Sequence, residues 1–559
     1  MVEHEKAQNG GVVLDANGPT PGAGPEELIQ GFLRACAAGV SDDFRVARQF
    51  LTPEAAARWN PGSGVTIYSD AEPVEYSYRA DGAVIVTAPS VGTLDAAGRY
   101  AQASAEATAS QAFSLMANED GEWRIATLED SLLMAQTVFS SQYLRTPLYF
   151  YTADRSALVP DVRWYPRSRA LTLMSNDLLA SPSDWLVGAA RSIFENKENN
   201  AEIAVTLIDA TAVVELPDGA AGLEPLERSL LQLQFEKTLV GSGLAQQVEL
   251  AVQGALIEAD SDLDIPSYPY VSAPLSALQD GKLVNIQGAE VAPTQAESDF
   301  TQRSYSAIAA DYGAPAARIV GLSADRSRLT KLVVATSDSE ELLAGNNLAK
   351  PSIDSLGWVW SADAGDPGAL IAVNLDTGAR VRLQVPEIGE GSVEQVIVSR
   401  EGARVVVINA RAGGTELLAY AVRRGESGRP EIAGEPLLFG QGFTQVRDVS
   451  WISEAKMLVL GNASGGGLGG NSSQASGGRG AAEAGSDSSL GAAAASLYTL
   501  DIGGHYEQVR AAAPDMVAVS SGRGLDSAVV IDSRGNAYRY SGSAWNTIAT
   551  GVATIAFPG

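Results

Sequence analysis

The N-terminal part of the chain changes from a helical to an extended pattern of apolar positions. PEELIQGFLRACAAGV predicts a helix that begins at Pro25. SDDFRVARQFL and TPEAAARW predict two further helices, the second capped by Thr52. From Val65 the apolar period is two, with hairpins expected around Asp81-Gly82 and Asp120-Gly121. After a flexible tail at residues 1–24, residues 25–143 are therefore predicted to form an α+β domain.

A second mixed pattern follows, from residue 144 to residue 254. PLYFYTA and QQVELAVQG read as strands, and EIAVTLIDATAVVEL alternates as a hairpin. SRALTLMSNDLLASP, DWLVGAARSIF and the amphipathic stretch EPLERSLLQLQFEKTLV read as helices. This region is predicted to be a second α+β domain.

Residues 255–559 have an almost purely extended pattern that repeats. LSADRSRLTKLVVAT, WSADAGDPGALIAVN and VSREGARVVVINA place Ser323, Ser361 and Ser399 at equal spacing, and weaker copies carry Ser453 and Ser520. The gap between those two copies holds a Gly/Ser/Ala-rich run, residues 461–495, which is expected to be a disordered loop. ALQDGKLVNIQG would close a ring with the C-terminal strands. The expected fold is a β-propeller of about six blades.

Charge and composition exclude several function classes. With 67 Asp+Glu against 39 Lys+Arg, the formal charge is −28, which argues against nucleic acid or anionic lipid as a partner. Cys36 is the only cysteine and falls on the apolar face of the first helix, so we expect it to be a small core residue. His4 and His505 are the only histidines. No metal site and no cofactor are predicted.

Catalytic motifs are also missing from the sequence. We find no G-x-S-x-G elbow, no P-loop and no dinucleotide fingerprint. The many carboxylates leave a hydrolase open as an alternative, but nothing in their spacing selects a pair. We therefore expect a protein that is not an enzyme.

Targeting features are equally sparse. The first ten residues, MVEHEKAQNG, have no basic or apolar segment of a signal peptide, and no window is long and apolar enough to cross a membrane. The expectation is a soluble chain, either cytosolic or the mature portion of an exported protein.

The segment LVPDVRWYPRS is unusual in so acidic a chain. Arg163 and Arg167 flank the aromatic pair Trp164-Tyr165, and prolines lie on both sides of that pair. Prolines favour an edge strand or turn, which would make the segment a structural junction. The alternative is part of a partner-binding surface, in which the arginines receive an acidic patch.

A second pair of aromatic residues, Trp358 and Trp360 in GWVWS, alternates along a predicted strand and so shares one face. One interpretation is packing within a propeller blade. The other is an exposed aromatic platform for a ligand, because Trp is frequent at binding hot spots.

Several of these motifs, in this order, resemble the LpqB lipoproteins of actinobacteria. The motifs are PEELIQGFLRACAAGVSDDFRVARQFLTPEAAARW, LVPDVRWYPRS, LLASPSDWLVGAARSIF, LLQLQFEKTLV and KPSIDSLGWVWS. The resemblance spans nearly the whole chain. It implies an N-terminal domain, a domain similar to the germination protein GerM, and a C-terminal propeller similar to TolB.

The resemblance also implies a function. Such proteins are lipidated and anchored on the outer face of the cell membrane, where they are associated with the sensor kinase MtrB of the MtrAB two-component system. This chain has no lipobox, so any lipid anchor would precede it. The expected function is non-enzymatic binding of the kinase ectodomain and modulation of its signalling in envelope homeostasis and division. The alternative is a module that binds peptidoglycan or another cell-wall glycan.

Overall fold

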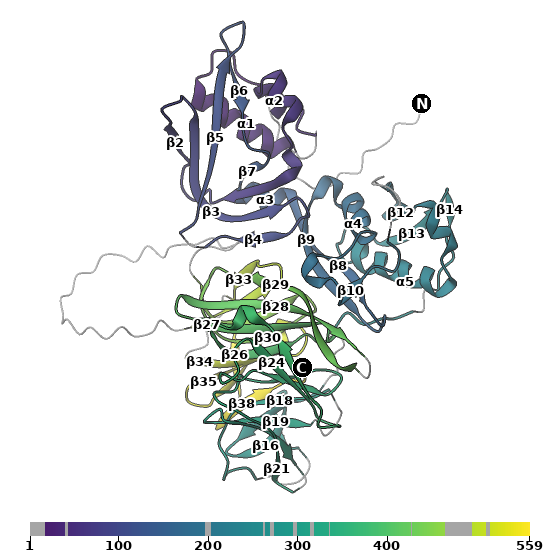
Figure 1. Ribbon diagram of the computed structural model, residues 1–559, viewed down its shortest axis with the longest axis vertical. Coiled ribbons are helices and arrows are strands. Elements are labelled where there is room, and N and C mark those ends of the chain that lie inside the picture. The colour runs from purple at the N-terminus through teal and green to yellow at the C-terminus, as the bar shows by residue number, and fades with distance from the viewer. Residues whose placement is uncertain are drawn as a thin grey trace, which may run out of the picture. The chain divides into compact units, whose positions relative to one another are not determined.

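A computed structural model of the chain contains two compact units (Figure 1). One comprises the residues up to Thr146 together with Val162–Met174, and the other comprises Pro147–Asp161 together with Ser175–Gly559. The structure describes residues 17–39, 43–104, 106–195, 203–260, 263–268, 273–294, 299–312, 318–334, 336–425, 428–463, 495–509 and 515–559.

The first unit has short helices followed by a mixed sheet. Its elements are α1 (Pro25–Gly39), η1 (Ala47–Phe50), α2 (Pro53–Arg58), η2 (Pro61–Ser63), β1 (Gly64–Tyr68), β2 (Glu75–Tyr78), β3 (Val84–Asp95), β4 (Tyr100–Gln102), β5 (Thr108–Ala117), β6 (Trp123–Thr127), β7 (Leu132–Ala135) and α3 (Gln136–Gln142). The sheet has the order β6-β5-β3-β1-β7, with β2 and β4 also paired to β3. Both expected hairpins, β2–β3 and β5–β6, are present.

Most of the predicted helices of this unit form, but one does not. The Thr52 side chain accepts a hydrogen bond from the Ala55 amide at 3.3 Å and caps α2, as predicted. Cys36 is buried on the inner face of α1, also as predicted. The helix expected in SDDFRVARQFL is wrong, because Asp43 and Phe44 have φ angles of 56° and 57° and only the short η1 follows. Two consecutive left-handed residues cannot continue a right-handed helix.

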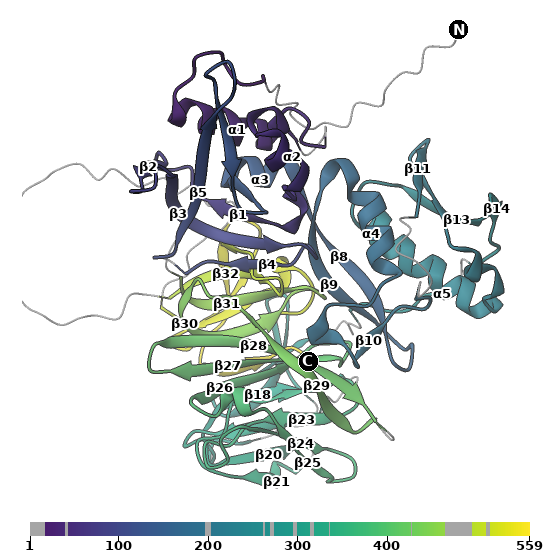
Figure 2. The same cartoon turned by 45° about the horizontal axis from the view of Figure 1, so that its top comes forward.

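The middle region, residues 143–256, is mixed as predicted (Figures 1 and 2). Its elements are β8 (Tyr143–Thr152), β9 (Leu158–Pro166), η3 (Arg167–Arg169), α4 (Ala170–Leu178), η4 (Asp184–Leu186), β10 (Ala190–Arg191), β11 (Val205–Ile208), β12 (Thr211–Glu215), η5 (Asp218–Gly222), α5 (Pro225–Phe235), the π-helical turn η6 (Glu236–Val240), β13 (Gln247–Val252) and β14 (Ala255–Leu256). They form two sheets, β10-β8-β9 and β11-β12-β13-β14. The division between the two compact units passes through β8, β9 and α4.

One helix that was predicted for the middle region does not form. DWLVGAARSIF contains only the short η4, and the chain then turns at Gly188, whose φ angle is +92°. Directly after this turn, Ala190 and Arg191 pair with β8 as the short strand β10. The apolar spacing of this stretch mimics a helix, but the glycine turn and the pairing with β8 determine its conformation.

Residues 275–556 form six sheets of four strands each among the described residues. The strands are β15 (Leu275–Gln279), β16 (Lys282–Gln287), β17 (Glu290–Pro293), β18 (Tyr305–Ala310), β19 (Ile319–Ser323), β20 (Arg328–Val333), β21 (Asp338–Ala344), β22 (Ser352–Ile353), β23 (Trp358–Ser361), β24 (Ala369–Asn374), β25 (Arg380–Gln384), β26 (Ser392–Val398), β27 (Arg404–Arg411), β28 (Gly414–Arg424), β29 (Pro430–Phe439), β30 (Phe443–Trp451), β31 (Lys456–Ala463), β32 (Ser496–Asp501), β33 (Tyr506–Gln508), β34 (Met516–Ser520), β35 (Val529–Asp532), β36 (Ala537–Tyr540), β37 (Trp545–Ala549) and β38 (Val552–Ala556). Two short helical turns, η7 (Pro386–Ile388) and η9 (Leu525–Ser527), lie between strands.

The six sheets close into a ring through their first strands. Each of these strands contacts the next one in the series β18, β22, β26, β30, β34 and β38. The ring closes because β38 also contacts β18. The last strand of the chain, β38, pairs with β15, so the first sheet is built from both ends of this region. Such closure by the C-terminal strand was expected, and the propeller fold is confirmed.

The repeated serines mark hairpins, but not the same hairpin in each sheet. Ser323 and Ser361 end the second strands of their sheets, whereas Ser399 follows a first strand and Ser520 ends one. The Ser323 hydroxyl accepts a hydrogen bond from the Arg328 amide at 3.0 Å, which fixes the turn between β19 and β20. Ser399 accepts in the same way from the Arg404 amide at 3.1 Å, whereas the Ser361 hydroxyl donates to the Ala349 carbonyl at 2.8 Å. The motif therefore does not mark the start of a blade.

The Gly/Ser/Ala-rich run lies between two strands that pair with each other. Gly461 in β31 is opposite Ser496 in β32, so the first residues of the predicted loop, Gly461–Ala463, belong to a strand. Residues 464–494 lie outside the described part of the chain. The insertion is therefore accommodated within one hairpin of the fifth sheet.

We expect ring closure by β38 to be a major contribution to stability. Ile555 is 3% exposed in the core of the first sheet, and Ile555→Ala should lower the free energy of unfolding by about 2–5 kcal/mol. Val291 lies in the same sheet but is 36% exposed, so Val291→Ala should change it by no more than about 0.5 kcal/mol. Denaturant titration measures both, and equal effects would contradict the role of β38.

Candidate functional site

The arginine-rich segment forms an edge strand, β9, and the short turn η3. β9 is at the edge of the sheet β10-β8-β9, which explains why Pro160 and Pro166 are tolerated there. Arg163, Trp164 and Tyr165 are only 5%, 8% and 4% exposed. Of the four residues proposed for partner binding in this segment, Arg167 alone is exposed.

Trp164 is a packing residue of the first unit. Its ring lies 5.0 Å from that of Phe139 and 5.9 Å from that of Tyr100, measured between centroids. Its backbone amide donates to the Gly98 carbonyl at 2.8 Å. A side chain at Gly98 would lie 2.7 Å from the Trp164 carbonyl, so only glycine permits this contact. For Trp164 the structure supports the junction interpretation, while a partner role for Arg167 stays a prediction.

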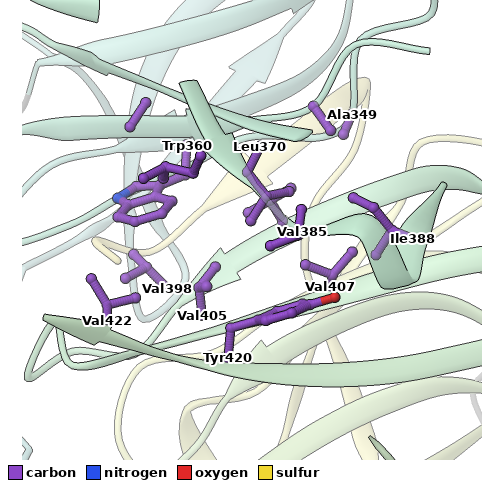
Figure 3. Close-up of a cluster of buried hydrophobic side chains, with 14 of the residues drawn as sticks. Ala349, Trp360, Leu370, Val385, Ile388, Val398, Val405, Val407, Tyr420 and Val422 are labelled. Carbon is purple, nitrogen blue, oxygen red and sulfur yellow. The ribbon is translucent and has the colours of Figure 1, made fainter. Parts of the chain in front are cut away.

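Trp358 and Trp360 lie inside the propeller and do not form an exposed platform. They are 4% and 0% exposed, and they belong to the core between the third and fourth sheets, where the Trp360 indole lies beside Val398 and Val422 (Figure 3). This corrects their assignment as partner-binding residues, because a ligand cannot reach a buried indole face. Alternation in GWVWS reflects blade packing.

Trp360 also holds a buried ion pair in place. Its indole N–H donates to Asp354 Oδ2 at 3.0 Å, and the Arg424 guanidinium lies 2.7 Å from the same carboxylate and 5.6 Å from the indole centroid. The Trp358 amide donates to the other oxygen of Asp354 at 2.9 Å. Because Asp354 is fully surrounded by donors, the charge of Arg424 is fixed at the end of β28.

Arg424 lines a cavity of about 300 Å³ between the middle region and the propeller. Asp154 contributes from the turn after β8, and Glu401 from the turn after β26. Burial acts to raise the pKa of Asp154, but hydrogen bonds from Thr152 and Ser156 outweigh it and hold that pKa below its ordinary value. Asp154 therefore lines the cavity as a carboxylate at neutral pH.

A buried network of charged groups joins the same two parts of the chain. Arg404 and Glu401 have fully buried side chains and pair at 2.6 Å. Arg404 also donates to the Glu454 carbonyl at 2.6 Å, and the Glu454 carboxylate accepts from the Tyr149 hydroxyl of β8 at 2.7 Å. The network thus runs from the fourth sheet through the fifth to the middle region.

In the linker before the propeller, Tyr268 is anchored between the fifth and sixth sheets. The Tyr268 hydroxyl lies 3.1 Å and 2.8 Å from the carbonyl oxygens of Trp451 and Gly522, and the Arg400 guanidinium lies 4.9 Å from the Tyr268 ring centroid. Just before it, the Pro266 carbonyl accepts from the Leu158 amide of β9 at 2.9 Å. The linker therefore binds both the middle region and the propeller.

A third contact joins η4 to β29. Gly434, with a φ angle of +69°, brings β29 against the carbonyl oxygens of Asp184 and Trp185, which would lie 3.4 and 3.6 Å from a side chain at this position. Few other residues adopt this conformation. The start of DWLVGAARSIF, which we predicted to be helical, is instead a turn that packs against β29.

The residues of this junction were missed by the sequence analysis. Glu401 and Arg404 are three residues apart in VSREGARVVV, a spacing that brings side chains together across a tight turn, but the segment was used only as a repeat. Nothing in the sequence pairs Tyr149 with Glu454, which are 305 residues apart. Within the described ranges, no group of three or more His, Cys, Asp or Glu side chains could hold a metal ion. None of the helices described there could span a membrane.

Comparison with known proteins gives two matching family models. "Lipoprotein LpqB, N-terminal domain" matches residues 18–140, and "Lipoprotein LpqB beta-propeller domain" matches residues 281–482, together more than half of the chain. Lipoprotein LpqB of Cutibacterium acnes is 28% identical over 80% of this chain and 79% of its own length. The Thermobifida fusca protein of the same name is 26% identical over 79% of this chain and 80% of its own.

Among solved structures, TolB from Acinetobacter baumannii has a TM-score of 0.34 and 10% identity, and covers 73% of this chain and 84% of its own. A chain of the nidogen/laminin complex also has a TM-score of 0.34, with 10% identity, and covers 50% of this chain and 96% of its own.

Tyr149→Phe tests the link between β8 and the propeller. Loss of a hydrogen bond to a carboxylate should cost about 1.5–3 kcal/mol near neutral pH. Burial and the Glu454 charge raise the pKa of Tyr149, so its stabilisation should decline as the pH rises past the ordinary tyrosine value of about 10. The difference in Tm between the wild type and Tyr149→Phe should therefore shrink above that pH. A difference that is absent, or that grows above that pH, would contradict the contact. Tyr540→Phe, at the end of β36, removes an exposed hydrogen bond to the Gly542 carbonyl and is the control.

Arg404→Met tests the buried ion pair. Leaving Glu401 charged and alone in the core should cost about 3–5 kcal/mol. The double variant Arg404→Met/Glu401→Leu should recover most of this loss, because no charge then remains buried. Denaturant unfolding of the single and double variants gives the coupling energy, and a double variant as unstable as the sum of the two single variants would contradict the pairing.

Proposed function

The chain belongs to the LpqB lipoprotein family, and on that premise we propose that it is a non-catalytic accessory protein that binds the extracytoplasmic domain of an MtrB-type sensor histidine kinase. Its curated relatives are named lipoproteins. The proposal therefore places the protein at the outer face of the cell membrane, held by a lipid.

One observation carries this proposal: most of the middle region and the propeller form a single compact unit. Three independent contacts support the junction: the Tyr149–Glu454 hydrogen bond, the Tyr268 linker, and the packing of η4 on β29. Surfaces from both parts are thereby held in a fixed relation. A large surface of this kind suits recognition of a folded protein domain better than recognition of a small ligand.

Modulation of a kinase requires that binding distinguishes its states. A bound protein shifts a conformational equilibrium only by the difference in its affinity for the two states. The proposed action is therefore tighter binding to one signalling state of the kinase ectodomain. No catalytic step is needed.

The structure removes one of the sites expected for the glycan-binding alternative. Two sites were expected for it, an aromatic surface or the mouth of the propeller, and the first is excluded at positions 358 and 360 because both indoles are buried. We therefore retain the protein–protein function as the single proposal.

The first test is binding of the whole chain to the purified extracytoplasmic domain of the cognate kinase, by calorimetry. We expect saturable binding with a Kd near or below about 1 μM. Cutting the chain at residue 254, the predicted domain boundary, would expose the buried junction, so point variants are preferable to fragments.

Arg167→Glu tests whether the first compact unit also contributes to binding, because Arg167 belongs to that unit and is the exposed member of the arginine-rich segment. Reversing its charge should weaken binding, whereas Arg534→Glu, on an exposed propeller hairpin, should not. Absence of saturable binding would refute the kinase as a partner. Equal affinity for active and inactive ectodomains would refute modulation.

A further inference from the structure

The helix α5 ends in a π-helical turn, η6, which changes the surface beside strand β13. The wider turn brings the Lys237 carbonyl so close to Gly241 that any side chain at that position would clash. π-Helical turns are rare and frequently lie at functional sites. This turn falls within LLQLQFEKTLV, a motif that also contacts the junction, where the Thr238 hydroxyl accepts from the Tyr149 amide at 3.2 Å.

A groove of about 750 Å³ lies between this turn, the first half of β13 and the linker at Leu263-Asp264. Figures 1 and 2 both show α5 alongside β13 and β14. The apolar lining residues are Leu233, Val240, Val248 and Leu263. Val240 is 37% exposed, which is unusual for a valine at the end of an otherwise well-buried helix. The groove therefore offers an apolar floor to solvent.

One side of the groove is an open strand edge. β13 pairs with β12 along its length, but on its other side the pairing extends only from Val252 to Leu250, whose carbonyl accepts from the Ile257 amide at 2.9 Å. In the part of the chain that the structure describes, no strand pairs with Gln247–Glu249 on that side. The Gln232 side chain covers one carbonyl there, that of Val248, at 2.7 Å. Unpaired strand edges accept extended segments of other chains.

The charged residues that line the groove indicate which kind of partner segment would fit it. Glu236, Glu249 and Asp264 line it, against the single base Lys237. The carboxylate of Glu236 is oriented by a hydrogen bond from Gln232 at 2.8 Å. An apolar floor with three carboxylates fits a segment that alternates apolar and basic side chains.

We infer that this groove binds an extended, basic segment of a partner protein, with an apolar side chain seated between Leu233 and Val240 and Lys or Arg side chains paired with Glu236 and Glu249. The segment lies along the open edge of β13. This binding site is separate from the junction with the propeller and does not require the kinase to be the partner.

The test uses the whole chain and a short fluorescent peptide in which valine and lysine alternate, followed by anisotropy. Val240→Asp and Glu249→Lys should each weaken binding at least about tenfold. Val517→Asp and Glu390→Lys, at exposed positions on the propeller, are matched controls and should leave the affinity unchanged. Circular dichroism melting curves show that each variant is folded.

Three results would overturn the inference. The first is no saturable binding of the lysine peptide. The second is equal weakening by Glu390→Lys, which would show non-specific attraction to an acidic protein. The third is undiminished binding of a peptide methylated at alternate backbone nitrogens, because such a peptide cannot pair with a strand edge. Failure of kinase binding would leave all three outcomes unaffected.

Discussion

The arrangement of the second compact unit depends on the contacts made by the buried guanidinium of Arg404. It pairs with Glu401 in its own turn, bonds to the Glu454 backbone in the next sheet, and lies 5.0 Å from the Trp451 ring centroid. A buried charge is costly unless it is paired and hydrogen-bonded, so the stability of this unit depends on these neighbours. Glu454 in turn accepts the Tyr149 hydroxyl, which extends the constraint to the middle region.

This constraint explains why a chain that reads as separate domains forms larger units. Tyr268, in the described part of the linker, donates to the Gly522 carbonyl and lies against the Arg400 guanidinium, so the linker is anchored at this residue. The glycine at position 434 lets a propeller strand approach the η4 turn. Each contact involves few residues, but together they hold residues 147–161 and 175–254 against the propeller. The groove beside β13 therefore lies on a strand whose position in this unit is fixed.

The sequence predicted the local structure well wherever one signal dominated. The Thr52-Pro53 start of α2, the Asp-Gly hairpins and the repeated strands of the propeller all formed as expected. Errors arose where backbone conformation overrode apolar spacing, at Asp43-Phe44 and at Gly188. The long helix before β13 was predicted, but its π-helical end was not, because no residue pattern distinguishes it from an ordinary last turn.

The candidate site was much harder to predict than the fold. Trp358 and Trp360 stand out in the sequence, but alternation alone cannot say which face of a strand is buried, and in a propeller both faces can be. The residues that join the middle region to the propeller are far apart in sequence, so only the folded chain brings Tyr149 to Glu454. Arg163 and Tyr165 were chosen for their charge and aromaticity, yet both are buried.

Native-state hydrogen exchange on the whole chain tests most directly whether the middle region and the propeller open as one unit. Amides of β12 and β13 and of β27 and β31 should show the same opening free energy and the same dependence on denaturant, because one cooperative unit opens as a whole. Exchange of β12 and β13 through a separate opening of lower free energy, while β27 and β31 stay protected, would contradict the account.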